Sequence, residues 1–479
     1  MTKIEIAASL YLTLLLTCVN CELKNLNASC DTRSLKFLEG VLILNAAGKG
    51  GSPCGGFSNS LNENSALNNA LTPVTSPEPG KFYAKQDITI TNPNIDANLC
   101  FTKDGSEPSC DESSCRSGEV YQAPFTISST ISIKAISCKS GKPSSGIVTS
   151  EYVYVPQYLY VSNATSMDIS LLSINKNDGS LQQNGTIATT GIPTGLTLAK
   201  NLGFVFVTIA YGDLNQFRIV SNSGLLTTNG TLASGTSATQ AIVEPRNRYA
   251  YVVNAPENNI ARYAINQSNG TLSAMGTIGT ALSFYAITTD SEGKFIYASD
   301  NVNSMINVYT IDQTNGSFNI TFSVATGLTP WHPKIHPNGK FLYVSNVGDQ
   351  TVSCFQRNEI DGNLHSRVDV MIDVTPAPRG IVFNKSGTYA YIVGNSTNRI
   401  YRASVNNNTG VLSVINSYLT SGTGTEKIAV DESGNFLYVI HPNNNNLTAF
   451  QINQTDGSLS LIGTYPLGSL PTGIVIAAF

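Results

Sequence analysis

Two of the four histidines in the chain, His332 and His336, lie close together in the stretch PWHPKIHPNGKFLYVSN, residues 330–346. An imidazole changes its charge near neutral pH, so it can act as a general base or hold a metal ion. Beyond residue 21, no two cysteines have the CxxC spacing of a structural zinc site. We therefore expect no metal and no cofactor, and treat the histidines as groups for proton transfer or binding.

The two histidines occupy different positions in a repeat of 45 to 48 residues that fills the second part of the chain. His336 precedes Pro-Asn-Gly and aligns with turn residues of other copies, so it is predicted to be a turn residue. His332 begins an apolar run. Other copies have small or polar residues at its position: Gly195, Gln240, Ala286, Gly380, Lys427 and Gly473.

Charged and aromatic residues gather at the position of His332 and at the one before it, in four successive copies. These residues are Tyr285, Trp331, His332, Arg379, Glu426 and Lys427. If equivalent positions converge in space, they form a concave site for a ligand. The alternative is structural, with Arg379 and Glu426 forming an ion pair while Trp331, the only tryptophan, plugs the centre.

Two independent motif series define the repeat. A Gly-containing turn recurs at Gly179, Gly224, Gly270, Gly316, Gly362, Gly410 and Gly457. An alternating apolar strand is centred on Tyr160, Phe206, Tyr251, Tyr297, Tyr343, Tyr391 and Tyr438. Seven copies of this length, with period-two alternation and no helical pattern, predict an all-β fold, a seven-bladed β-propeller over about 155–479.

A third signal concerns the ends of the propeller. Each copy contains an apolar run such as PTGLTLA or RGIVFN ahead of its central aromatic residue, but the region opens on QYLYVSN and closes on PTGIVIAAF. The last strand is therefore expected to complete the first blade, which would join the two ends in one sheet.

The strings HPNGKFLYVSN, DSEGKFIYASD and DESGNFLYVIHP, with the DGSL turns, resemble the lactonase family of seven-bladed propellers, the 6-phosphogluconolactonase type. They resemble YVTN-repeat propellers of surface proteins more loosely. The lactonase resemblance implies Pro-Arg-His at the start of an innermost strand and Asn-Glu after the next strand. Pro330, His332 and Arg379 match, whereas Trp331 replaces the arginine and Val347 stands where the acid would be.

The missing acid favours binding over catalysis. We expect the propeller to bind a protein partner or a small ligand at its central funnel, through Tyr285, Trp331, His332, Arg379, Glu426 and Lys427. The alternative is a lactone hydrolase, with His332 as general base and Arg379 stabilising the oxyanion.

Residues 74–154 are predicted to form a small β-sandwich. The string FTKDGSEP, followed by YQAPFTIS and ISIKAIS, resembles the chitobiase and β-hexosaminidase C-terminal type of module, which supplies no catalytic residue. Four of the nine cysteines, Cys100, Cys110, Cys115 and Cys138, lie in this unit. On an exported chain they are expected to form two disulfides, pairing Cys100 or Cys110 with Cys115 or Cys138.

The N-terminus reads as an export signal. Lys3 precedes an apolar stretch from Ile6 to Leu16 that is short for a membrane span. With Leu15 three residues before Cys18, the segment resembles a bacterial lipoprotein signal, and Cys21 is the alternative acylation site. The other interpretation is an ordinary cleaved signal with free cysteines. The expected organisation is a signal peptide at 1–17 and a flexible tether at 18–73.

Composition agrees with this assignment. Charged residues make up 13% of the chain, and the net charge is −4, which leaves no basic surface for nucleic acid. We expect a monomeric, lipid-anchored cell-envelope protein, at the outer membrane or cell surface. Asn-x-Ser/Thr triplets such as those at Asn163, Asn184, Asn229 and Asn315 are interpreted as turn residues.

Overall fold

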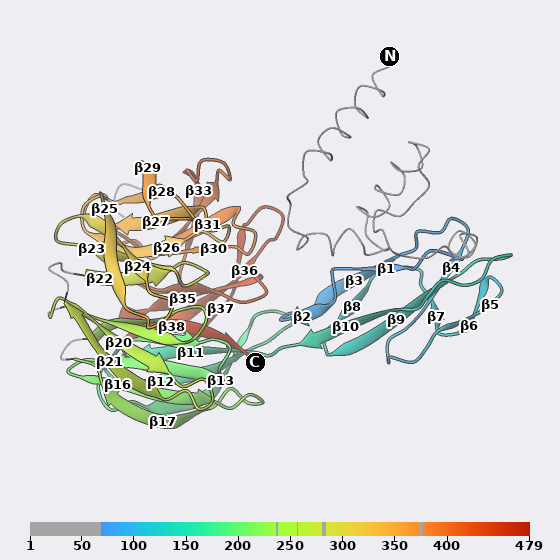
Figure 1. Ribbon diagram of the computed structural model, residues 1–479, viewed down its shortest axis with the longest axis horizontal. Helices are drawn as coiled ribbons and strands as arrows, with labels where there is room; N and C mark the ends of the chain where they lie inside the picture. The colour runs from blue at the N-terminus through green and yellow to red at the C-terminus, as the bar shows by residue number, and fades with distance from the viewer. Residues whose placement is uncertain (1–68, 236–237, 256, 280–283, 373–376) are drawn as a thin grey trace, which may run out of the picture. The chain divides into compact units, whose positions relative to one another are not determined.

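The computed structural model describes residues 69–479, except 236–237, 256, 280–283 and 373–376 (Figure 1). The expected signal peptide, Cys18, Cys21 and nearly all of the expected tether lie outside the described residues. In the part of the chain that the structure describes, no helix is long and apolar enough to cross a membrane.

The N-terminal strands form a β-sandwich. One sheet has the order β1–β3–β8, the other the order β2–β10–β9–β4–β7, and β5 and β6 make a separate hairpin. The strands are β1 Val74–Ser76, β2 Gly80–Phe82, β3 Gln86–Thr91, β4 Asn98–Thr102, β5 Ser109–Asp111, β6 Ser114–Ser117, β7 Glu119–Val120, β8 Phe125–Ile127, β9 Ile131–Cys138 and β10 Val148–Tyr154. Alternate residues of the two sheets, such as Ile88 and Phe101, face each other in one core.

The expected two disulfides are confirmed. Cys100 of β4 is bonded to Cys115 of β6, and Cys110 of β5 is bonded to Cys138 of β9. Both bonds therefore tie the β5–β6 hairpin to the five-stranded sheet. A hairpin of two short strands has little core of its own, so the crosslinks supply the constraint that packing does not.

Seven four-stranded sheets follow, and they confirm the propeller. In blades two to seven the sheet order is the chain order. Blade two contains β14 Pro193–Ala199, β15 Phe204–Ile209, β16 Asp213–Ile219 and β17 Leu226–Ala233; blade three β18 Ala238–Val243, β19 Tyr249–Asn254, β20 Asn259–Ile265 and β21 Leu272–Gly279; blade four β22 Phe284–Thr289, β23 Phe295–Asp300, β24 Met305–Ile311 and β25 Phe318–Ala325. Blade five contains β26 Pro330–Ile335, β27 Phe341–Asn346, β28 Thr351–Arg357 and β29 Leu364–Met371; blade six β30 Pro378–Phe383, β31 Tyr389–Gly394, β32 Arg399–Val405 and β33 Leu412–Leu419; blade seven β34 Ile428–Val430, β35 Phe436–His441, β36 Asn446–Ile452 and β37 Leu459–Pro466.

Blade one joins the two ends of the propeller. It contains β11 Gln157–Asn163, β12 Asp168–Ile174 and β13 Leu181–Ala188, and its innermost strand is β38 Pro471–Ala478. β38 pairs antiparallel with β11, with Leu159 opposite Ile476. The expected closure by the last strand is thus confirmed, and the red C-terminal strand lies beside the green start of the propeller in Figure 1.

The two motif series of the sequence meet between blades. The hydroxyl of Tyr343 in blade five donates to the carbonyl of Gly410 in blade six at 2.6 Å, and Tyr251 does the same to Gly316 at 2.9 Å. Six of the seven central aromatics make this bond, because the seventh is Phe206. The tyrosines are fully buried, so they join blades and offer no ligand platform.

Candidate functional site at the mouth of the channel

Six of the seven innermost strands, all but β34, begin with a bulge, which can direct two neighbouring side chains of a strand to the same side. In β26, Pro330 pairs with Asn346 and Pro333 with Val344, so Trp331 and His332 together face the single residue Ser345. This geometry explains why two adjacent positions of the repeat both contribute side chains to one end of the channel.

Serine hydroxyls fix these bulges to the neighbouring blade. Ser299 Oγ donates to the carbonyl of Trp331, and Ser345 Oγ donates to the carbonyl of Arg379, both at 2.7 Å. Ser345 also accepts from the backbone N–H of His332 at 3.3 Å. Ser299 and Ser345 were not predicted from the sequence, although both lie in the repeated strings YASD and YVSN.

Trp331 lies in the middle of a stack. The Tyr285 ring centroid is 3.6 Å from that of Trp331, and the Arg379 guanidinium carbon is 4.4 Å from the Trp331 ring. Burial, followed by the nearby Glu426 carboxylate, raises the pKa of Tyr285 to about 12, so its hydroxyl stays protonated. Because Tyr285 and Arg379 already contact the indole, the stack resembles the plug of the structural interpretation more than an open sugar platform.

Arg379 and Glu426 form an ion pair between blades six and seven. The pair is only partly exposed, with 21% of the Arg379 side chain and 30% of the Glu426 side chain accessible. Asn395 donates to the same Glu426 oxygen at 3.2 Å. In contrast, Nε of Arg379 is buried without a hydrogen-bond partner among the described residues, so one donor of this guanidinium is left over.

His332 is paired with a lysine. Nζ of Lys427 lies 2.5 Å from Nε2 of His332, and the ammonium donates to the neutral ring. Burial and the cations Lys427, Arg379 and Lys334 hold the pKa of His332 well below 6.5. The imidazole is therefore uncharged at neutral pH and its Nε2 lone pair is occupied, which makes it a weak general base.

The six sequence-predicted residues thus converge in one continuous group, running from Lys427 through His332, Tyr285 and Trp331 to Arg379 and Glu426. They do not share one cavity. A cavity of about 360 Å³ opens beside Arg379 and Glu426 and is also lined by Asn395, Gly424, Pro442, Asn443, Leu470, Pro471 and Thr472. His332 does not line it. His336 lies at the other end of β26, as expected of a turn residue.

His336 is locked by two hydrogen bonds. Its Nε2–H donates to the carbonyl of Gly387 at 2.8 Å, and its Nδ1 accepts from the N–H of Asn338 at 3.3 Å. Gly387 has φ +75°, and a Cβ there would lie 2.4 Å from the imidazole. Both ring nitrogens are engaged in structure, which leaves none for catalysis. No group of three or more potential ligands arranged for a metal ion occurs among the described residues.

The half-buried ammonium of Lys427 gives a testable pH dependence. Burial, followed by repulsion from Arg379, outweighs the favourable effect of Glu426 and lowers its pKa from 10.5 to about 8. Between pH 8 and 10.5 the unfolded chain keeps a proton that the folded chain has lost, so stability rises with pH. From pH 8 to 9.5, the free energy of unfolding should rise by up to about 1.4 kcal/mol per pH unit relative to Lys427→Met.

Denaturant titrations of the two proteins at several pH values measure this difference, and other titrating groups cancel in the comparison. Equal slopes for wild type and Lys427→Met would show that the ammonium is solvated and that its pairing with His332 is not as described.

Comparison with known proteins agrees with the architecture. The family model "Lactonase, 7-bladed beta-propeller" matches residues 231–376 and 368–478, and the "Chitobiase/beta-hexosaminidase C-terminal domain" model matches residues 77–149. The chain belongs to the lactonase family of seven-bladed β-propellers. None of the curated proteins compared with it matches in sequence.

Solved structures with the same fold include the periplasmic gluconolactonase of Pseudomonas aeruginosa, with 19% identity and a TM-score of 0.60. A candidate 6-phosphogluconolactonase from Bacteroides uniformis has 18% identity and a TM-score of 0.61. Each similarity covers 67% of this chain and 99% of the other. At this identity the likeness describes the fold.

Proposed function

We propose that the propeller binds a small, hydroxyl-rich ligand, of the sugar or sugar-acid type, in the cavity beside Arg379 and Glu426. The observation that supports this most is the composition of that cavity, in which Arg379, Asn395 and Asn443 offer donors while Glu426 offers an acceptor. Mixed donors and acceptors in a small concave space suit a polyhydroxylated molecule. A volume of about 360 Å³ also favours a small molecule over a protein segment.

Lactone hydrolysis at the same mouth is the second candidate, because the chain belongs to the lactonase family. Opening a lactone requires a base to activate water and a donor for the oxyanion. His332 is a weak base for the reasons given above, which leaves Glu426 as the base and Arg379 as the oxyanion donor. These two groups neutralise each other in an ion pair, so the geometry favours binding over turnover.

Calorimetric titration with gluconate and with glucono-δ-lactone tests the proposal. We expect saturable binding of at least one of them, and Arg379→Ala should weaken it by roughly 10- to 100-fold, the value of a hydrogen bond to a charged group. The matched control is Arg367→Ala, which removes an arginine that pairs with Asp369 on β29, the outermost strand of blade five.

The binding site would be contradicted if neither compound gave saturable heat, or if Arg367→Ala weakened binding as much as Arg379→Ala does. Lactone turnover that is lost in Glu426→Gln and retained in His332→Ala would establish the second candidate with Glu426 as the base. Loss in His332→Ala alone would show that the histidine is the base after all.

We also propose that the chain is exported and anchored by a lipid at Cys18, with Cys21 as the alternative. The two disulfides indicate an oxidising compartment, which supports export. The same proposal places the anchored chain at the outer membrane or the cell surface. For the ligand of the funnel, a protein partner in place of a small molecule is the remaining alternative.

Expression in a bacterial host with an alkyne-labelled fatty acid tests the anchor. The full chain should carry the label, Cys18→Ala should lose it, and Cys21→Ala should keep it. Label retained in Cys18→Ala and lost in Cys21→Ala would move the anchor to Cys21. An unlabelled full chain would contradict lipid anchoring.

A further inference from the structure

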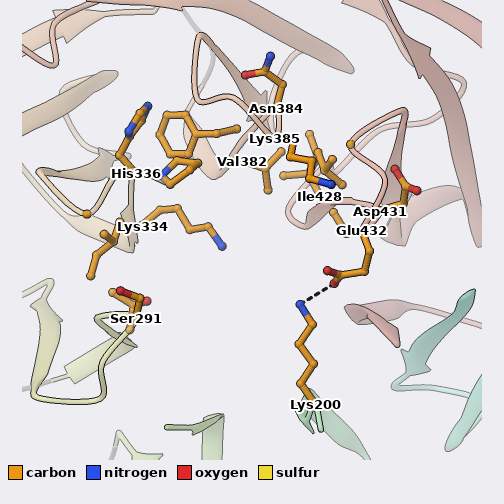
Figure 2. A pocket seen from close by; sticks show the side chains of 18 of the residues that line it. Lys200, Ser291, Lys334, His336, Val382, Asn384, Lys385, Ile428, Asp431 and Glu432 are labelled. Carbon is orange, nitrogen blue, oxygen red and sulfur yellow. Dashed lines mark ion pairs between the residues drawn. The ribbon is translucent and has the colours of Figure 1, made fainter. Parts of the chain in front are cut away.

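A second, larger cavity of about 760 Å³ lies at the opposite end of the innermost strands (Figure 2). The bulged starts of β26 and β30 form the first mouth, whereas the cavity is lined by the ends of these strands and by the turns that follow them. Apolar residues of its wall include Val382, Phe383, Ile428 and Ile474. None of the six residues of the first mouth lines it.

Three lysines from three blades line this cavity. Lys200 follows β14, Lys334 lies in β26, and Lys385 follows β30. Figure 2 shows Lys334 and Lys200 extending toward the central space from different sides, with Lys200 joined to Glu432. That ion pair measures 2.7 Å. Lys334 and Lys385 have no ion-pair partner among the described residues.

The remaining titratable groups of the cavity do not balance these two lysines. The Asp431 carboxylate is buried and accepts from the N–H of Phe436 at 2.9 Å, from the N–H of Ser433 at 3.0 Å and from the amide of Gln157 at 2.8 Å. It is thereby used to build its own turn. Both ring nitrogens of His336 are engaged in the hydrogen bonds described above.

Lys334 is under electrostatic strain from its surroundings. Its side chain is exposed, yet desolvation by the surrounding protein, followed by repulsion from Lys200, lowers the pKa of its ammonium. An anion placed among the three lysines would remove that repulsion and gain charge-assisted hydrogen bonds. The serine and threonine hydroxyls of Thr288, Thr289 and Ser291 on the same wall could donate further bonds.

We propose that this second cavity binds a small multivalent anion, a compound with a phosphate group or several carboxylates, held by Lys334, Lys385 and Lys200. The apolar wall receives the uncharged part of that compound. The site is separate from the mouth beside Arg379, so the two proposals can fail independently.

Titration of the full chain with pyrophosphate and with citrate at low ionic strength tests this site. We expect saturable binding that weakens as salt is added, and Lys334→Met should weaken it roughly tenfold or more. Lys334→Arg keeps the charge and should retain most of the affinity. The matched control is Lys340→Met, since Lys340 is exposed in the turn after β26 but does not line the cavity.

Binding of only one probe identifies the anion class, phosphate or carboxylate, and supports the site. Failure of both probes to bind, or wild-type affinity in both Lys334→Met and Lys385→Met, would overturn it. Should a variant not fold, the wild type still decides the question, because pyrophosphate or citrate must raise its melting temperature above that in sodium chloride of equal ionic strength. Arg379→Ala should leave this binding unchanged.

Discussion

Deletion of Leu470–Phe479 is expected to abolish the cooperative unfolding transition of the propeller. These residues contain β38, the innermost strand of blade one, which pairs with β11. Without it, β11 becomes an unpaired strand edge, and the buried side chains of Ile476 and Ala477 leave cores shared with the neighbouring blades. In a closed propeller every blade packs against two neighbours, so loss of one innermost strand disrupts the packing of the whole ring.

Scanning calorimetry of the truncated and full chains measures this effect. The control removes only Phe479, which lies beyond β38, and it should lower the melting temperature modestly while keeping one cooperative propeller transition. A chain without residues 470–479 that melts as the full chain does would contradict the closure.

Gly270→Ala is expected to cost about 2–5 kcal/mol of stability. Gly270 has φ +71°, and a Cβ there would lie 2.3 Å from atoms of the buried Phe204 ring in the preceding blade. The substitution therefore adds both backbone strain and a clash between blades.

Gly276→Ala separates these two terms. Gly276 lies in the same blade with φ +90°, but a Cβ there meets nothing within 4 Å. It should cost only the backbone term, about 1–2 kcal/mol. Denaturant unfolding of both variants gives the comparison, and equal losses would mean that the turn glycines are required for their conformation alone and not for contact between blades.

The fold was predictable because the same local structure, and with it the same sequence pattern, recurs in all seven blades of the propeller. The hydroxyl of Tyr343 bonds the carbonyl of Gly410 across the blade interface, and the bonded pairs from blade one to blade seven lie 64 to 67 residues apart, so the two motif series keep nearly the same spacing in every copy. Closure by β38 was predictable as well, since the repeat begins and ends on complementary strands. The particular disulfide pairs were not, because spacing alone left the connectivity open.

The candidate site was predictable in membership but not in its contacts. Alignment of the repeats brings equivalent positions to one end of the channel, and Tyr285, Trp331 and Arg379 do lie together there. Which neighbours pair depends on side-chain direction after the bulge, which sequence does not reveal. For that reason only the structure shows that Lys427 donates to His332 and that His332 does not line the cavity beside Arg379.

The second cavity had a signal in the sequence that went unused. In each repeat one turn position is equivalent to His336 of blade five. The residues that directly follow this position in four other blades line the cavity: Lys200, Ser291, Lys385 and Glu432. The same alignment that assembles the first mouth therefore assembles a ring at the opposite end. That two lysines of this cavity lack an ion-pair partner among the described residues could be inferred only from the structure, in which Asp431 accepts backbone hydrogen bonds and Glu432 pairs with Lys200.

The fluorescence of Trp331 tests the central claim most directly, because the chain has no other tryptophan and Arg379 packs against its ring. We expect gluconate or glucono-δ-lactone to change the emission in a saturable way, with the same affinity as in calorimetry and a large loss of affinity in Arg379→Ala. Emission that stays constant while calorimetry reports binding would place the ligand elsewhere on the propeller and contradict a binding site at this mouth.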